Sequence, residues 1–174
     1  MMTEKRPILD PCCGSRMMWF DPNHPEVVFG DIRREVLTVT DRSHGFIDGK
    51  RTIHINPDLQ MDFRAIPFPD DTFRLVVFDP PHIARTSPTS WIAAKYGKLL
   101  PDWRDNLRAG FKECFRVLKE YGVLIFKWSE VEIKTSEVLE LTPYKPLFGH
   151  RSGKKAGTHW IVFMKLPAGG GDAA

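Results

Sequence analysis

FRLVVFDPPH, residues 73–82, combines a strongly apolar run with an acid and two prolines. The run Leu75–Phe78 is rich in β-branched and aromatic residues, which is typical of a strand buried on both faces of a parallel sheet. Pro80 and Pro81 have no backbone N–H to donate, and Pro80 favours an extended conformation at Asp79. We therefore expect a rigid turn that presents the Asp79 carboxylate at the carboxyl end of a central strand, where open α/β sheets bind ligands. A strand that simply ends in a proline-rich loop is the alternative.

A second short strand is predicted at Pro7–Asp10, and it too ends in an acid. The next residues, 11–15, read PCCGS, and small residues with a glycine after a strand let the backbone approach a ligand closely. We expect a helical turn at Arg16–Phe20. An ordinary tight turn between a strand and a helix explains the same residues.

Two more acids follow short apolar strands. Asp31 comes after Val27–Phe29 and lies about twenty residues beyond Asp10, the offset at which βαβ nucleotide-binding folds place a ribose-binding acid. Asp62 ends a short strand and is followed by Phe63, so this pair is a candidate for contacting an adenine ring. Surface acids are common, and a plain surface role is the alternative for both.

The segments between these strands have weaker patterns. Val36–Thr40 alternates like an exposed strand, and Asp48-Gly49 is a hairpin-type turn signal, so we expect a peripheral hairpin without chemistry. Ile83–Pro101 is long, polar and rich in proline, which is typical of a lid or substrate-binding loop. A short irregular helix is the alternative for that loop.

The clearest helix is predicted at Trp103–Tyr121, with Asp102 as its N-cap and Gly122 as its C-terminal cap. One apolar stripe runs along it at helical spacing, which predicts that Cys114 is a buried thiol and not a nucleophile. The stripe consists of Leu107, Phe111, Cys114, Phe115 and Leu118.

The rest of the chain continues this alternation. Val123–Phe126 predicts a buried strand, Thr135–Leu141 a helix, and Leu147–Phe148 and Trp160–Met164 two strands joined by a basic, glycine-containing turn. Because strands and helices alternate, we expect a single α/β domain with a mostly parallel sheet, helices on both faces and one antiparallel edge strand.

Composition and charge fit one domain, residues 1–167, followed by a Gly/Ala-rich tail at 168–174 that we expect to be disordered. The chain has 174 residues, 42% hydrophobic and 27% charged, enough for a sizeable core. A net charge of +3 is compatible with nucleic acid but does not by itself indicate it. Three cysteines, two of them adjacent, make a poor disulfide framework, and no Cys/His spacing indicates zinc. We expect a cytoplasmic protein with no bound metal, no signal peptide and no membrane span.

Together these motifs resemble those of class I S-adenosylmethionine-dependent methyltransferases, which have a Rossmann-like fold. Within that superfamily the chain is similar to the amino-methyltransferases with an Asp/Asn-Pro-Pro-aromatic motif. The similarity runs from Asp10–Ser15 through Asp31 and Asp62 to Asp79–His82. The small size and the run Met17–Asp21 resemble short phage and prophage methyltransferases.

The resemblance implies two sets of site residues. The catalytic set, which would hold the acceptor amine and stack on its base, is Asp79, Pro80, Pro81 and His82. The set that would bind S-adenosylmethionine is Asp10, Pro11, Cys12, Cys13, Gly14, Asp31, Ile32, Asp62 and Phe63. The chain departs from the family at Arg16, where a second glycine is common, and at His82, where Tyr, Phe or Trp is usual.

The resemblance also implies the acceptor: an exocyclic amine of a nucleic-acid base, first of all adenine N6, in DNA ahead of RNA. In that fold the last hairpin returns to the active-site edge, so its basic turn and two neighbouring strand ends would meet phosphates. The residues expected to bind the substrate are Arg85, Lys127, His150, Arg151, Lys154 and Lys155. Two alternatives remain: a methyltransferase for a protein amide or a small molecule, and a cofactor-binding protein without transferase activity.

Overall fold

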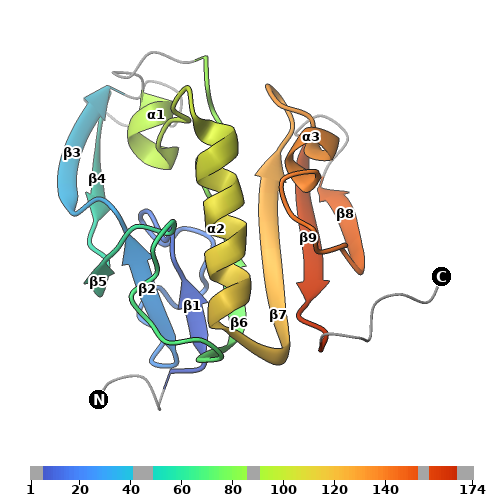
Figure 1. The fold of residues 1–174 in the computed structure, drawn as a ribbon. Coiled ribbons are helices and arrows are strands. Elements are labelled where there is room, and N and C mark those ends of the chain that lie inside the picture. Colours follow the sequence, from blue (N-terminus) through green and yellow to red (C-terminus); the bar gives the residue numbers. More distant parts are fainter. Residues whose placement is uncertain (1–5, 41–48, 86–90, 153–156, 168–174) are drawn as a thin grey trace.

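The computed structural model describes residues 6–40, 49–85, 91–152 and 157–167. Within them a seven-stranded sheet has the order β5-β2-β1-β6-β7-β9-β8 (Figure 1). Its strands are β1 (Ile8–Asp10), β2 (Val27–Asp31), β5 (Leu59–Gln60), β6 (Phe73–Phe78), β7 (Leu118–Ser129), β8 (Phe148–Ser152) and β9 (Thr158–Met164). A separate two-stranded sheet is formed by β3 (Glu35–Thr40) and β4 (Lys50–Ile55). The tail at 168–174 lies outside the described residues.

The sheet confirms the predicted fold class. Neighbouring strands from β5 to β7 are parallel, and β9 is antiparallel to both β7 and β8. The antiparallel strand, β9, therefore lies between β7 and β8 and not at the edge, where an antiparallel strand was predicted. The reason is that the final hairpin joins the sheet through β9. As predicted, β6 is central, and Val76, Val77 and Phe78 are buried.

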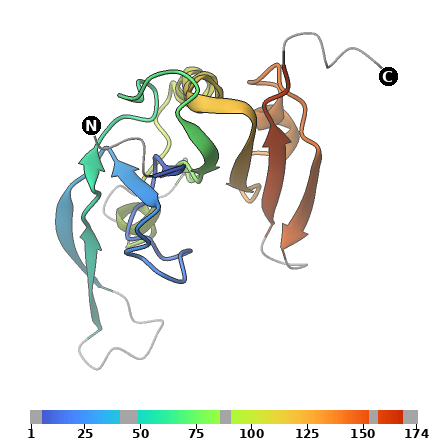
Figure 2. The same ribbon diagram turned by 90° about the horizontal axis from the view of Figure 1, so that it is seen from below.

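Helix α2 (Trp103–Val117) supplies most of the packing on one face of the sheet (Figure 2). Its buried stripe includes Leu107, Phe111 and Phe115, and Cys114 is fully buried among them, as predicted. Two short helices, α1 (Trp91–Tyr96) and α3 (Thr135–Leu139), complete the described helices. The former lies within the predicted lid segment, and the latter is the predicted helix after β7.

Both ends of α2 differ from the sequence expectation. Asp102 is the N-cap residue, but its carboxylate accepts from the Asn106 side chain at 3.0 Å and makes no capping bond to the backbone. The predicted C-terminal cap is wrong: the helix ends at Val117, and Gly122 is buried inside β7. A Cβ at Gly122 would lie 2.8 Å from the Lys119 carbonyl oxygen, so close backbone approach explains this glycine.

The opposite face of β1 and β2 is covered by turns. Residues 11–26 form successive turns, so the helical turn predicted at Arg16–Phe20 is absent. The Trp19 ring packs edge-on against Phe29, with ring centroids 5.2 Å apart, and closes a small apolar cluster on that face. We expected helices on both faces of the sheet. On this face of β1 and β2, turns and the Trp19 ring cover the strands instead.

The β3–β4 pair confirms the predicted peripheral hairpin, whose connecting residues 41–48 lie outside the described part of the chain. It stands beyond the β2 side of the sheet, away from β8 and β9 (Figure 2). Among the described residues, no helix has the length and apolar character needed to cross a bilayer.

Candidate active site

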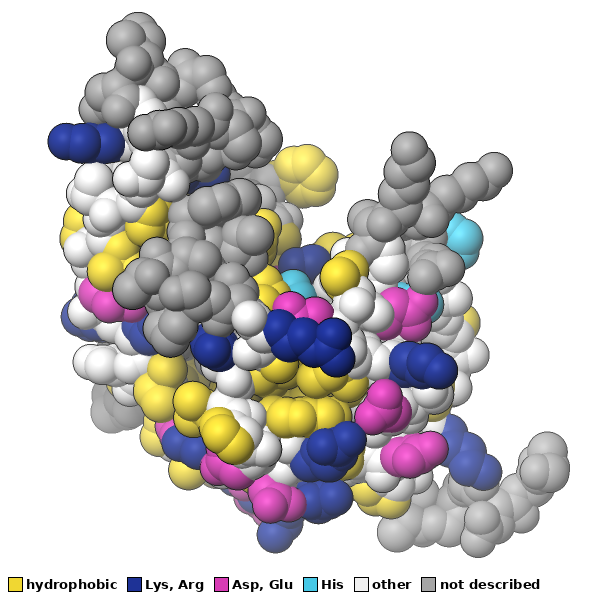
Figure 3. All heavy atoms as spheres, turned by 90° about the horizontal axis from the view of Figure 1, so that it is seen from above, with side chains coloured by type: hydrophobic (Ala, Val, Ile, Leu, Met, Phe, Trp, Pro, Cys, Tyr) yellow, Lys and Arg dark blue, Asp and Glu magenta, His cyan; other side chains and the backbone are white. Residues whose placement is uncertain are grey.

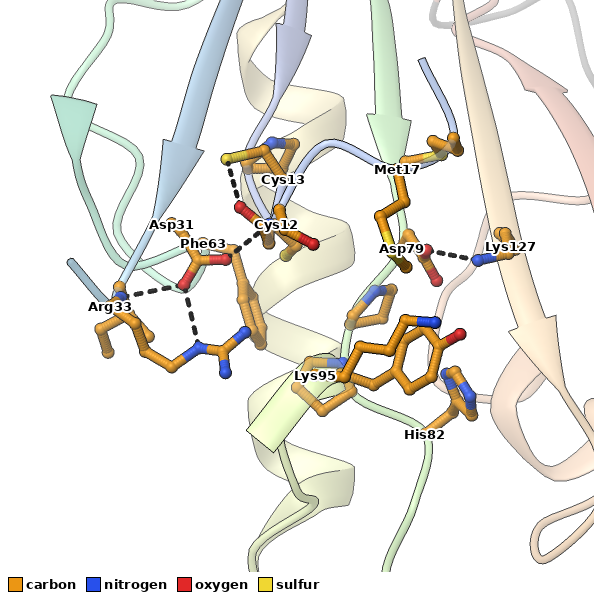
Figure 4. Close-up of a pocket in the computed structure, with 18 residues that line it drawn as sticks. Cys12, Cys13, Met17, Asp31, Arg33, Phe63, Asp79, His82, Lys95 and Lys127 are labelled. Carbon is orange, nitrogen blue, oxygen red and sulfur yellow. Dashed lines mark hydrogen bonds and ion pairs between the residues drawn. The ribbon is translucent and has the colours of Figure 1, made fainter. Parts of the chain in front are cut away.

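The carboxyl ends of β1, β2, β6 and β7 meet at one edge of the sheet, and a single pocket opens there (Figure 4). It brings together most of the predicted cofactor and catalytic residues. Those that line it are Pro11, Cys12, Cys13, Gly14, Asp31, Ile32, Phe63, Asp79, Pro80, Pro81, His82 and Lys127. Seen from above, acidic, basic and histidine side chains gather near the middle of this edge (Figure 3).

The glycine loop after β1 is tied to β2 by its backbone. The Gly14 N–H donates to Asp31 Oδ2 at 2.9 Å, and the Cys13 N–H donates to the Gly30 carbonyl at 2.8 Å. Gly14 has φ +51°, a left-handed conformation that glycine adopts without strain. This loop therefore brings bare backbone to the pocket, as predicted for a cofactor loop.

Arg16, the position at which the resemblance noted from the sequence leads us to expect a second glycine, also has a left-handed backbone, with φ +57°. Its side chain offsets that strain. The guanidinium donates to the Pro22 and Asn56 carbonyls at 2.7 Å each and to Asp58 Oδ1 at 2.8 Å, and it stacks 4.1 Å from the Phe29 ring centroid. The loop thus keeps a glycine-like path without the glycine.

Asp31 lines the pocket as predicted, although its carboxylate is buried and already accepts several hydrogen bonds. Besides the Gly14 N–H, it accepts from the Arg33 backbone N–H at 2.9 Å and from Arg33 Nε at 3.4 Å. Each carboxylate oxygen has two lone pairs, so capacity for a ligand hydroxyl remains.

Asp10 and Asp62 do not line the pocket. Asp10 is fully buried and accepts from Trp19 Nε1 at 2.8 Å and from the Cys12 N–H at 3.1 Å, so it supports the loop from below. Burial raises its pKa to about 7. The carboxylate of Asp62 is held on both oxygens by Arg64, whose hydrogen bonds lower the Asp62 pKa. Only its neighbour Phe63 reaches the pocket.

The two adjacent cysteines are structural. Burial raises the pKa of the Cys12 thiol well above its usual range and that of Cys13 to about 12. Neither thiol is therefore a nucleophile at neutral pH. Among the described residues, no three His, Cys, Asp or Glu side chains are grouped so as to hold a metal ion.

Asp79 and Lys127 form an ion pair at the predicted catalytic position. Lys127 Nζ lies 2.5 Å from Asp79 Oδ2, and both side chains are more than four-fifths buried. Asp79 Oδ1 is buried and has no hydrogen-bond partner among the described residues. Lys127, which was predicted to meet phosphates, therefore reaches the pocket, but it contacts the carboxylate that was predicted to be catalytic.

His82 also lines the pocket, between two aromatic rings. Its ring centroid lies 5.8 Å from that of Tyr96 and 6.1 Å from that of Trp128. Burial is the main cause that lowers the His82 pKa, and the Lys127 charge lowers it further. The imidazole is therefore neutral at pH 7, and its Nδ1 is buried without a hydrogen-bond partner.

Two other predicted substrate residues, Arg85 and His150, do not line this pocket. Arg85 is exposed, and its backbone N–H donates to Glu132 Oε2 at 2.9 Å. His150 is exposed on β8, whose carboxyl end lies at the same edge of the sheet as the pocket (Figure 1). Arg151 belongs to the same strand, its side chain not being described, and Lys154 and Lys155 lie outside the described residues.

The structure adds pocket residues that the sequence interpretation missed: Ser15, Met17, Met18, Arg33, Lys95 and Tyr96. Tyr96 and Lys95 come from α1, in the segment that was considered as a lid. The aromatic residues Trp91 and Tyr96 indicated that part of this segment packs down, but nothing in the sequence placed that part beside the pocket.

Comparison with solved structures shows which fold this is. PH0226 protein from Pyrococcus horikoshii matches with a TM-score of 0.57 at 17% identity, over 94% of this chain and 84% of its own. A TehB-like SAM-dependent methyltransferase from Corynebacterium glutamicum matches with 0.56 at 14% identity, over 92% and 81%. A SAM-dependent methyltransferase from Methanosarcina mazei matches with 0.51 at 16% identity, over 95% of each chain.

At these identities the likeness shows the fold alone, a Rossmann-like fold that this chain shares with two proteins named as SAM-dependent methyltransferases. Neither a family model nor a curated protein sequence matches the chain.

Proposed function

We propose that the protein is an S-adenosylmethionine-dependent N-methyltransferase that acts on an exocyclic amine of a nucleic-acid base, first of all adenine N6 in DNA. One observation carries the proposal. The Asp79-Pro80-Pro81 turn after β6 faces the same pocket as the glycine loop after β1 and the acid after β2. Two solved neighbours named as SAM-dependent methyltransferases support the choice of cofactor.

The predicted cofactor residues that line the pocket suit S-adenosylmethionine by their chemistry. The loop at Gly14 offers close backbone approach, Asp31 offers lone pairs to ribose hydroxyls, and Phe63 offers an aromatic edge for the adenine. When bound, the cofactor supplies an electrophilic methyl group on its sulfonium. Asp10 would act only through the loop that it supports, and Asp62 through its neighbour Phe63.

The acceptor side of the pocket suits a weakly nucleophilic amine. The Asp79 carboxylate and the Pro80 carbonyl would accept hydrogen bonds from the two N–H groups of the amine. These hydrogen bonds would localise the nitrogen lone pair and aim it at the methyl group. The carboxylate would also stabilise the positive charge that develops on nitrogen during transfer. An aromatic pocket at the sheet edge suits a base taken out of its stack or presented by a single strand.

Incubation with methyl-labelled cofactor and with DNA, RNA and cell-extract protein in parallel tests the proposal. Label in DNA, at N6 of adenine after digestion to nucleosides, is the expected result. Label in protein alone would replace the acceptor with a side-chain amide, and label in RNA alone would move the activity to that polymer. Cofactor binding by calorimetry without transfer to any polymer would instead indicate a binding protein without transferase activity.

A further inference from the structure

Two buried polar atoms without hydrogen-bond partners lie in residues of the same pocket. They are Asp79 Oδ1 and His82 Nδ1; the other such buried side-chain atom among the described residues, His159 Nε2, lies 3.1 Å from Glu130 Oε1. A buried polar atom left unpaired destabilises the folded state, so folded proteins pair nearly all of them. Two such atoms in one pocket indicate groups that a bound molecule completes.

Asp79 is held in one orientation. Lys127 engages Oδ2 at 2.5 Å, so the second oxygen, Oδ1, is the one left for a new donor. An ionised carboxylate only accepts hydrogen bonds. The ligand atom that pairs with Oδ1 must therefore carry a hydrogen, as an amine does.

His82 is held by its neighbours as well. Tyr96 and Trp128 flank its ring, and Figure 4 shows His82 on the Lys127 side of the pocket. A neutral imidazole carries one N–H donor and one lone pair, and either can lie at Nδ1. With the hydrogen at Nδ1, the site presents an acceptor, Asp79 Oδ1, and a donor, His82 Nδ1, from one turn.

We propose that His82 Nδ1 donates a hydrogen bond to the ring nitrogen beside the acceptor amine, so that Asp79 and His82 together recognise the amine and N1 of adenine. This inference rests on the proposed function and names the specificity-determining partner of Asp79. It also replaces the stacking role expected for His82 from the sequence, because stacking would leave Nδ1 unpaired. The donor and acceptor of the site match the N6 hydrogen and the N1 lone pair of the base.

The test uses two single-stranded oligonucleotides that differ at one atom. One carries adenine at the methylated position and the other carries 1-deazaadenine, in which C–H replaces N1. Wild-type protein should prefer adenine by about 10- to 100-fold in kcat/KM, because the analogue leaves the His82 donor unpaired. His82→Phe should reduce this ratio to that set by the intrinsic reactivity of the two amines. His82→Asn, whose amide N–H can replace the ring N–H, should retain part of it.

If His82 had a merely structural role, His82→Phe would lower the activity on both oligonucleotides equally. The ratio of the two kcat/KM values therefore distinguishes recognition by His82 from a structural role. His54→Phe changes an exposed histidine of β4 outside this pocket and should leave the ratio and the rates unchanged. Calorimetry with S-adenosylhomocysteine checks that the pocket of each variant is intact. A His82→Phe protein that binds this product normally and keeps the wild-type ratio would overturn the inference. Wild-type protein that labels neither oligonucleotide would overturn the proposed function itself, and the inference with it.

Discussion

At the residue scale, the ion pair between Asp79 and Lys127 has the largest consequence. Two opposite charges that share a mostly buried site depend on each other, because each loses hydration that only the other replaces. Lys127 therefore does more than carry charge: it keeps the Asp79 carboxylate in place. Because Lys127 is paired with Asp79, its charge is not free to bind a phosphate.

Removing one partner should show this dependence. We expect Lys127→Met to lower the free energy of unfolding by on the order of 2–3 kcal/mol, because it leaves the Asp79 carboxylate buried without its cation.

Asp79→Asn should lower kcat by about 10²- to 10³-fold while the affinity for cofactor changes little. In urea denaturation, the double variant should lose less stability than the sum of the single variants. Additive losses would show that the two side chains act independently.

Arg16 shows how a residue other than glycine can hold a left-handed backbone. Its left-handed backbone costs about 1 kcal/mol or more, and its hydrogen bonds and ring contact offset that cost. We expect Arg16→Gly and Arg16→Ala both to destabilise the protein, with the alanine variant less stable by about 1 kcal/mol because only glycine adopts this φ freely. Equal stabilities in urea denaturation would mean that the loop takes another backbone path without Arg16.

At the element scale, α2 connects the core to the cofactor side of the pocket. Gly110 lies on its buried face, where a Cβ would come within 2.7 Å of Phe63 and 2.8 Å of Phe78. Phe63 lines the pocket and packs edge-on against Phe78 with ring centroids 5.3 Å apart. The missing side chain at Gly110 therefore makes room for a pocket residue.

Gly110→Ala tests this connection. Alanine favours helix by about 1 kcal/mol over glycine, so the intrinsic propensity alone predicts a more stable protein. We expect the opposite, a lower melting temperature and a cofactor affinity weakened several-fold, because the methyl group displaces the Phe63 ring. Lys112→Ala, on the exposed side of the same helix, is the matched control and should leave both quantities near wild type. A Gly110→Ala protein with raised stability and full affinity would contradict the proposed packing.

At the scale of the whole molecule, three acids follow three parallel strands, and the fold treats them differently. Asp10 becomes a buried support, Asp31 a pocket wall, and Asp79 one half of an ion pair. Burial opposes ionisation of Asp10, which gives the stability of the domain a pH dependence.

The sign follows from the pKa values. The Asp10 pKa is raised from 3.8 to about 7 in the folded protein, so the native state binds the proton more tightly than the unfolded chain. The stabilisation from this group is fully present below about pH 4 and is lost as the pH rises to about 7. We expect the difference in unfolding free energy between wild type and Asp10→Asn to shift in favour of the variant between pH 5 and about pH 8. A difference that does not change with pH, measured by urea denaturation, would show that Asp10 titrates normally.

Local patterns in the sequence were enough to determine the strands, the main helix and the acids that end the first, second and central strands. Apolar periodicity, prolines and glycines act on their immediate neighbours, so the turn at Asp79–His82 and the loop at Gly14 were predictable. The Asp62–Arg64 ion pair could also have been predicted from the sequence, because the two residues are two positions apart.

Only the tertiary structure decided which side chains meet. Lys127 and Asp79 are 48 residues apart, and their pairing depends on β6 and β7 ending side by side. Trp19 lies over β2 and donates to Asp10 because turns replace the expected helix, and Tyr96 reaches the pocket through the packing of α1. The physical reason is the same in each case. A strand pattern specifies which residues are buried, whereas the partner of each buried polar group is set by the neighbouring strand or turn that the fold brings beside it.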